Sequence, residues 1–373
     1  MKMFDNFIQF LFVILILLLS ISIKAQELKS SRTIMLIVDG LASGAIDRIP
    51  LDHLSQFKKE GTYYKEVYLP LPAHPEKSDA YPWSCSLPNP VLMSGTVFIG
   101  RDNLKEHLIQ HSFKNQKTAF IVNDRAYKDI SGGFDTYIDL RQNFEDIFKD
   151  ELVFETTKKI IKEEDPVFLR IHIQGPGSSG YKSKEKVNEN KVWYEDIWHS
   201  QSPYVNQLQK ADELINNFIK WLKDEGYMKN TTIFIFGDHG QADTGWHPPF
   251  DPKSGKTELL IIGDGVKHNE VFEYAEIIDI APTIAFIHQV AQPKYSEGQI
   301  LKEAFKNFES NLPHSAKHMK FLNNLLLKAE KQKDLGRENP TQFKNILDIG
   351  VWHKDLDSIT IKNFIDKQKN FLD

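Results

Sequence analysis

The chain has 373 residues, of which 46 are basic and 51 acidic, giving a formal net charge of −5. This balance argues against a nucleic-acid-binding protein, so an anionic substrate must be bound by local charges. The length allows one large α/β domain, or one domain with an appendage. Cys85 is the only cysteine, which excludes an internal disulfide and leaves the core to stabilise the fold.

The N-terminal segment is almost wholly apolar over Phe7–Ser22, follows Lys2, and is succeeded by a small residue, Ala25. This pattern predicts a secretory signal peptide over residues 1–25, with a secreted or periplasmic mature protein. An uncleaved membrane anchor and a buried helix are the alternatives. We expect cleavage near Ala25 and no stable membrane insertion afterwards.

Five continuous apolar runs follow along the chain, and each has the length of a strand buried on both faces. Two of them end in acidic residues, Asp39 after the first run and Asp238 after the fourth. The runs are Thr33–Val38, Thr118–Val122, Val167–Ile173, Thr232–Phe236 and Leu259–Ile262.

Helical patterns lie between these runs, at Leu51–Glu60, Phe144–Glu164 and Tyr204–Glu225. Strands that alternate with helices predict an α/β fold with a mainly parallel sheet sandwiched by helices. We expect this domain to cover residues 26–300, with a polar helical C-terminal extension over residues 301–373.

The acidic residues that follow two of the predicted strands are candidate metal ligands. Ligands of parallel sheets collect beyond the carboxyl ends of the strands, where Asp39 and the pair Asp238-His239 fall. Carboxylate and imidazole ligands suit zinc or a similar divalent ion. Taken singly, Asp39 could lie in an ordinary turn and Asp238 could cap a helix.

The segment "CSLPNPVLMSG" places Ser86 two residues before Pro88. A serine in this position can be a helix N-cap, with Pro88 in the first turn. It can also be a nucleophile, because free N–H groups at a helix N-terminus stabilise an alkoxide and an anionic substrate oxygen.

Together these motifs resemble the alkaline phosphatase superfamily, in particular its nucleotide-pyrophosphatase, phosphodiesterase and sulfatase-like branch. The resemblance covers residues 32–290 and rests on five elements in the family's order. They are the strand ending at Asp39, Ser86 before Pro88-Asn89, Asp238-His239-Gly240, the following His247, and "DIAPTI" over Asp279–Ile284.

The resemblance implies two divalent ions that flank a nucleophile in an in-line displacement. Asn89 would then donate to the substrate oxygen. His247 would belong to the second metal site. Carried over residue by residue, the first site consists of Asp39, Ser86, Asp238 and His239.

The chain departs from the family pattern at the second metal site. The pattern's acid and histidine are replaced by Gly177 and Tyr181 in "PGSSGY". We therefore expect one divalent ion, held by Asp238 and His239, with His247 left for another role; zinc is the first expectation, and calcium and manganese are alternatives. Substitute ligands could come from His172, His199, Glu195 or Asp196, although each is better explained as an ordinary core or surface residue.

The leading hypothesis for function is an exported metal-dependent hydrolase or transferase of phosphate or sulfate esters, with Ser86 as nucleophile. A formylglycine sulfatase is disfavoured, because Pro90 stands where the C/S-x-P-x-R motif requires arginine. The expected partner is an anionic small molecule or polysaccharide.

A polysaccharide lyase acting by β-elimination on a uronate-containing, ulvan-like sulfated glycan is the second hypothesis. Such a reaction needs a neutralised carboxylate, a base and an acid, and Tyr181 and His247, with Arg170 and His172 nearby in sequence, could supply them. Three aromatic residues in the 182–201 segment could stack on sugars or simply pack under a long loop: Trp193, Tyr194 and Trp198. The third hypothesis is a non-catalytic binding protein of the same fold.

Overall fold

The computed structural model describes residues 32–69, 86, 88–96, 103–248, 251 and 253–308. The predicted signal peptide therefore lies outside the described residues, as does most of the predicted C-terminal extension. Among the described residues, no helix combines the length and the apolar character needed to cross a membrane.

One eight-stranded sheet organises the described part of the chain, in the order β4-β3-β5-β1-β6-β7-β2-β8. All neighbouring strands are parallel except β7, which runs antiparallel to β6 and β2. The predicted mainly parallel α/β sheet is thus confirmed. The strands are β1 (Arg32–Val38), β2 (Thr62–Tyr68), β3 (Thr118–Val122), β4 (Thr136–Asp139), β5 (Phe168–Ile173), β6 (Thr231–Phe236), β7 (Lys256–Gly263) and β8 (Glu270–Glu276).

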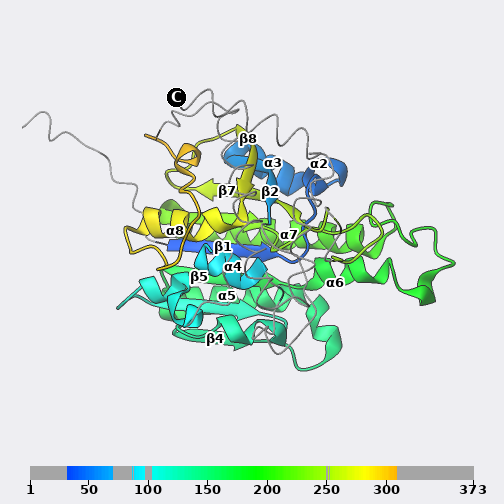
Figure 1. Cartoon of the computed structure of the whole chain (residues 1–373), viewed down its shortest axis with the longest axis horizontal. Coiled ribbons are helices and arrows are strands. Elements are labelled where there is room, and N and C mark those ends of the chain that lie inside the picture. Colours follow the sequence, from blue (N-terminus) through cyan, green and yellow to red (C-terminus); the bar gives the residue numbers. More distant parts are fainter. Residues whose placement is uncertain are drawn as a thin grey trace, which may run out of the picture.

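Helices cover both faces of the sheet, because the central strands are apolar on both faces. In β1, Ile34 and Leu36 belong to one buried cluster, whereas Met35 and Ile37 belong to the other. Helices α4 and α8 pack on the second of these faces, and α2, α3, α5 and α7 on the first (Figure 1). The α-helices are α2 (Ala45–Arg48), α3 (Asp52–Glu60), α4 (Pro88–Ser94), α5 (Asp150–Glu164), α6 (Gly175–Lys182), α7 (Pro203–Asp224) and α8 (Ile280–His288).

Local signals explain where two of the helices begin. The Ser202 side chain accepts a hydrogen bond from the Val205 backbone N–H at 3.1 Å and caps α7. The predicted helix over Phe144–Glu164 is divided instead into a 3₁₀ turn, Phe144–Phe148, followed by α5. Lys149, which separates the two, has φ −95° and ψ 55° and so interrupts helical geometry.

The strand register brings the candidate ligands to one edge of the sheet. Val38, the last residue of β1, pairs with Ile173 of β5, and Ile37 pairs with Phe236, the last residue of β6. The segments that follow these three strands therefore leave the sheet side by side at its carboxyl edge.

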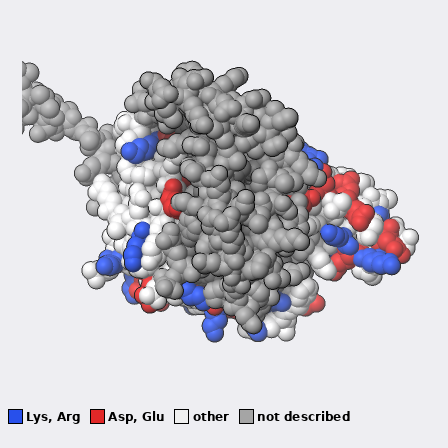
Figure 2. Space-filling view, in the orientation of Figure 1, with Lys and Arg blue, Asp and Glu red and all other residues white. Residues whose placement is uncertain are grey.

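The segment over residues 182–201 is an irregular excursion that projects beyond α6 at the right of Figure 1. Its return is fixed to the segment after β6, because the Ile197 N–H donates to the Asp243 carbonyl at 2.9 Å. Figure 2 shows basic and acidic side chains interspersed at this end of the molecule.

The packed core extends past residue 300, where the sequence placed the domain boundary. Leu301, Ala304 and Phe305 are buried in the same cluster as α4 and α8. Phe305 also forms an isolated antiparallel bridge with Val266. Residues 301–308 consequently belong to the α/β domain.

Candidate functional site

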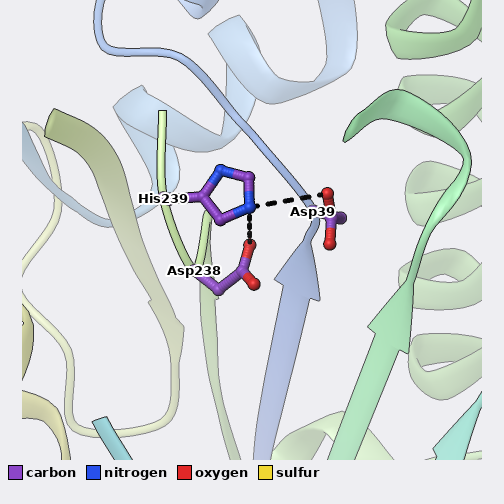
Figure 3. Close-up of side chains that lie close together, drawn as sticks. All are labelled: Asp39, Asp238 and His239. Carbon is purple, nitrogen blue, oxygen red and sulfur yellow. Dashed lines mark ion pairs between the residues drawn. The ribbon is translucent and has the colours of Figure 1, made fainter. Parts of the chain in front are cut away.

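Asp39, Asp238 and His239 form a buried cluster at the carboxyl edge of the sheet (Figure 3). One ligand atom from each lies within 4.8 Å of the others. The His239 Nε2 atom is 3.9 Å from Asp39 Oδ1 and 3.8 Å from Asp238 Oδ1. The other ring nitrogen, Nδ1, lies 2.8 Å from the Gly240 carbonyl oxygen. An Nδ1–H that donates to this carbonyl leaves the Nε2 lone pair directed at the carboxylates, as in metal-binding histidines.

The electrostatics of this cluster fit a bound cation. Burial raises the pKa of Asp39, against the lowering effects of His239 and of the hydrogen bond from Tyr127. Burial opposes protonation of His239, but the charges of Asp238 and Asp39 raise the pKa of this imidazole overall. Two carboxylates and an imidazole with so little exposure need a compensating positive charge, and oxygen and nitrogen donors of this kind suit a divalent ion.

Asp39 is held by two side chains on its other oxygen. The Tyr127 hydroxyl donates to Asp39 Oδ2 at 2.7 Å, and His172 Nε2 lies 3.2 Å from the same atom. Burial lowers the pKa of His172 to about 3, so the ring is neutral and donates through Nε2–H. Both neighbours thus orient one carboxylate oxygen and leave Oδ1 facing His239.

Ser86 is connected to the cluster through Asn89, the second residue of α4. The Asn89 Nδ2 group donates to Ser86 Oγ at 2.9 Å and to Asp238 Oδ2 at 2.8 Å. The side-chain carbonyl oxygen of Asn89, Oδ1, accepts a hydrogen bond from the Arg170 guanidinium. Because a guanidinium can only donate, Arg170 determines which way the Asn89 amide points.

Arg170 is a completely buried cation at the centre of this network. Its guanidinium lies over the rings of Phe120 and Tyr127, with its central carbon 4.4 Å and 5.4 Å from the two centroids. It also lies 3.3 Å from His172 Nδ1, which therefore acts as the acceptor. One side chain thus orients Asn89 on the serine side and His172 on the Asp39 side.

Gly177 occupies the position where the family pattern has an acid. A Cβ atom built on Gly177 would lie 1.6 Å from Asp39 Oδ1. The space that a side chain would need is therefore filled by the Asp39 carboxylate itself. Position 177 cannot carry any side chain while Asp39 keeps its place beside His239.

His247 lies against the cluster, whereas Tyr181 lies at the protein surface. His247 is buried, and its ring centroid is 3.9 Å from that of His239. Tyr181 is 45% exposed, and its ring packs edge to face on Trp246 at 5.0 Å. The structure thus brings His247 to the cluster and leaves Tyr181 at the surface end of an aromatic contact.

The possible substitute ligands have local partners of their own. Asp196 accepts a hydrogen bond from the Trp198 backbone at 3.0 Å, and His199 Nδ1 accepts one from the Gln201 backbone at 3.1 Å. Glu195 is exposed on the excursion. His172, described above, lies beside Asp39 as a hydrogen-bond partner.

Trp198, one of the candidate sugar-stacking residues, is used for packing. Its indole N–H donates to Asp243 at 2.6 Å, and the Arg48 guanidinium lies 3.6 Å from the centre of its ring. These contacts attach the excursion to the domain, as expected of an aromatic residue under a long loop.

Tyr127 is the main component of the site that the sequence did not reveal. It lies in a 3₁₀ turn over Arg125–Ile130 and has no motif around it. The available signal was Asn123-Asp124, a polar pair directly after the apolar β3 run at the carboxyl edge. Asn123 also contributes, since it donates to Asp150 at 2.9 Å beneath the start of α6.

We expect the purified protein to bind about one divalent ion per chain, since only Asp39, Asp238 and His239 converge as buried carboxylate and imidazole ligands among the described residues. Elemental analysis after dialysis measures this ratio. Two tightly held ions per chain would show that further groups complete a second site.

The variant Gly177→Ala should weaken metal binding by at least about tenfold, because the new methyl group displaces a ligand that Tyr127 and His172 currently orient. Isothermal titration with zinc provides the measurement. Gly132→Ala is the matched control, since a Cβ there meets nothing within 4 Å. Equal zinc affinity in the two variants would contradict the assignment of Asp39 as a ligand.

The mainly parallel sheet, the serine two residues before α4 and the carboxylate and imidazole cluster at the strand ends together define a protein of the alkaline-phosphatase-like superfamily. Within it, the chain belongs to the sulfatase family: the family model described as Sulfatase matches residues 91–287, more than half of the chain. The matched region contains Asp238, His239 and His247 and begins after Ser86 and Asn89.

Two curated proteins share short stretches with the chain. GPI ethanolamine phosphate transferase 2 of Candida glabrata is 24% identical over 140 residues, 30% of this chain and 17% of that protein. An ulvan-active sulfatase of Formosa agariphila is 25% identical over 123 residues, 32% of this chain and 20% of that protein. The matches thus cover a fifth or less of the relatives' own lengths.

A solved structure extends the similarity to the fold. The phosphonate monoester hydrolase of Agrobacterium radiobacter superposes with a TM-score of 0.58 and 10% sequence identity. The superposition covers 75% of this chain and 78% of that chain. At this identity the likeness concerns the fold alone.

Proposed function

We propose that this member of the sulfatase family cleaves or transfers a phosphate or sulfate ester, using Ser86 as the nucleophile and one divalent ion held by Asp39, Asp238 and His239. The observation that carries the proposal is the Asn89 amide, which donates to both Ser86 Oγ and Asp238 Oδ2. This contact places a hydroxyl next to a ligand set that fits a metal. Metal dependence is also general in the sulfatase family.

The residues around Ser86 have separate roles in this reaction. Ser86 gives its hydroxyl proton to solvent, and its Oγ forms a bond to phosphorus or sulfur while the bond to the ester oxygen breaks. Water, or an acceptor alcohol, then displaces Oγ and takes the group, and Oγ regains a proton from solvent. Asn89 holds Ser86 Oγ through Nδ2 and keeps it beside the cluster. Asp39, Asp238 and His239 would hold the divalent ion, which would supply Lewis acidity to the reaction when bound.

His247 is the candidate proton donor for the leaving alcohol. Its imidazole is buried and stacks on His239 at 3.9 Å, adjacent to the metal ligands. Positions 177 and 181, the partners expected in the family pattern, supply no ligand beside it. A buried imidazole beside the metal ligands can carry the proton that the departing alkoxide needs.

The substrate that we propose is an anionic ester carried by a small molecule or a polysaccharide. One curated relative is named as active on ulvan and another as a transferase of ethanolamine phosphate. These names support esters of sulfate and phosphate on larger alcohols. Tyr181, one of the two residues assigned to proton transfer in the elimination hypothesis, is 45% exposed and packs on Trp246, and none of its contacts among the described residues reaches Asp39, Asp238 or His239.

The test is to incubate the protein with an aryl phosphate, an aryl phosphodiester, an aryl sulfate and a sulfated uronate-containing polysaccharide, each with and without a chelator. We expect release of phenol, phosphate or sulfate, and its loss on chelation. An ultraviolet-absorbing unsaturated uronate would instead identify a lyase. Binding without any product would identify a non-catalytic protein.

A further inference from the structure

Asp39 and His239 lie on two separate segments, which follow β1 and β6 (Figure 3). Hydrogen bonds orient the Oδ2 atom of Asp39, but the Oδ1 atom, which faces His239, is covered by the backbone of a third segment. This segment is α6, where a Cβ on Gly177 would lie 1.6 Å from Asp39 Oδ1. The position of Asp39 Oδ1 relative to His239 therefore depends on where α6 lies.

The helix α6 has little helical stability of its own. It is only eight residues long, and three of these residues are glycine, which is among the least favourable residues in a helix. Contacts from other segments must therefore set its place. Asp150 provides one of them, because its side chain accepts a hydrogen bond from the Gly175 N–H at 3.1 Å.

Gln241 provides a second contact, directly at the residue that covers Asp39. Its side chain is completely buried, and its Nε2 group donates to the Gly177 carbonyl at 3.1 Å. The reversed amide would place Oε1 against this carbonyl oxygen, so the NH₂ group must face Gly177. Gln241 also lies two residues after His239 on the same segment. One side chain thus joins the segment that carries His239 to the residue that covers Asp39.

Two further glycines pack closely around the Gln241 amide. A Cβ on Gly40, the residue after Asp39, would lie 2.4 Å from Nε2, and a Cβ on Gly180 would lie 2.6 Å from Oε1. The amide therefore fills the space that side chains at these two positions would need. The segments after β1 and β6 and the helix α6 all meet at this amide.

We propose that Gln241 is a positioning residue for the metal cluster: its amide fixes Gly177 over Asp39 and thereby sets the position of Asp39 Oδ1 relative to His239. The inference rests on the function proposed above, because it takes Asp39 and His239 as metal ligands. Gln241 acts through Gly177 and is not itself a ligand.

The variant Gln241→Met keeps the length of the side chain and removes its amide. It should raise the dissociation constant for zinc about tenfold, as the loss of a group that supports a metal ligand commonly does. Isothermal titration of the metal-free protein with zinc measures this change and requires no catalytic activity.

Gln110→Met is the matched control, because Gln110 makes the same kind of contact elsewhere. Gln110 is also buried, and its Nε2 group donates to the carbonyls of Ile130 and Gly132 at 3.1 and 2.7 Å. In both glutamines, Oε1 has no hydrogen-bond partner among the described residues. Gln110 lines a cavity together with Thr118, the first residue of β3, and so lies at the opposite edge of the sheet from the cluster. Gln110→Met should leave the affinity for zinc unchanged.

Gly180→Ala tests the position of the Gln241 amide without changing its chemistry, and it decides the question even if Gln241→Met fails to fold. The new methyl group should displace the end of the flexible Gln241 side chain, whereas alanine favours the helix more than glycine does. The affinity for zinc should therefore fall about tenfold without a matching loss of thermal stability, which a purely structural role would not produce. In the Gln241→Ala background, which has room for the methyl group, Gly180→Ala should have no further effect.

The same titrations can overturn the role of Gln241 and leave the cluster intact. Equal affinities for zinc in Gln241→Met, Gln110→Met and the unmodified protein would do so, as would additive effects of Gly180→Ala and Gln241→Ala. If the unmodified protein bound no zinc, manganese or calcium, the cluster would not be a metal site, and the proposed function would fail together with this inference.

Discussion

Ser86→Ala should lower turnover of the ester substrate by several powers of ten, because the variant lacks the atom that forms the covalent bond. Asn89 would retain its bonds to Asp238 and Arg170, so the cluster should persist and bind metal as before. Steady-state rates with the best ester of the substrate panel measure the effect. Elemental analysis of the same sample shows whether the metal remains.

A serine within α4, the helix that begins two residues after Ser86, provides the control. Ser94 is buried in α4 and donates to the Pro90 carbonyl at 2.6 Å, within the helix. Ser94→Ala should therefore leave the rate within a few-fold of the unmodified protein. If Ser86→Ala were no more harmful than Ser94→Ala, Ser86 would not be the nucleophile.

Arg170→Met should lower kcat by about a hundredfold with little change in KM, since misplacing a reacting group by about 1 Å can have an effect of this size. Arg170 is a positioning residue: without its hydrogen bond, the Asn89 amide can rotate and present its oxygen to Ser86. Arg170→Lys should not restore the rate, because an ammonium lacks the planar group that reaches both Asn89 and His172.

The control for packing is Phe120→Leu, which alters the ring beneath the guanidinium and touches neither Asn89 nor Ser86 by hydrogen bonds. Thermal unfolding of both variants shows the loss of stability that each change causes. If Phe120→Leu and Arg170→Met were equally stable and lowered kcat by the same factor, Arg170 would have only a structural role.

The strands that the sequence predicts are those buried on both faces. Each of the five apolar runs forms a strand, because continuous burial leaves a continuous apolar signal. The three others are mixed in character: β2 exposes Lys65, β4 is half-buried throughout, and β8 is an edge strand. Strands of this kind owe their place to their neighbours rather than to their own composition.

The same distinction applies to the candidate site. Asp39, Asp238 and His239 could be proposed because Asp39 directly follows one apolar run and Asp238-His239 follow another after a single glycine, so that one topological rule places them together. Tyr127 and Arg170 could not be assigned their roles in this way. Their contacts with Asp39, Asn89 and His172 depend on the directions of side chains from different elements, which the sequence does not show. The sequence shows that glycine replaces an acid at position 177. It does not show that the Asp39 carboxylate occupies the space of the missing side chain, because this depends on atomic packing.

The shared Asn89 amide couples metal affinity to events at Ser86. Its single NH₂ group donates to the serine and to Asp238 at once, so a change at either acceptor alters the hydrogen bond available to the other. Thermodynamic reciprocity then requires that an anionic inhibitor which binds better in the presence of metal also strengthens metal binding by the same factor. The protein should therefore lose metal more slowly during dialysis when an anionic inhibitor is bound at Ser86. The inhibitor should likewise dissociate more slowly when metal is bound.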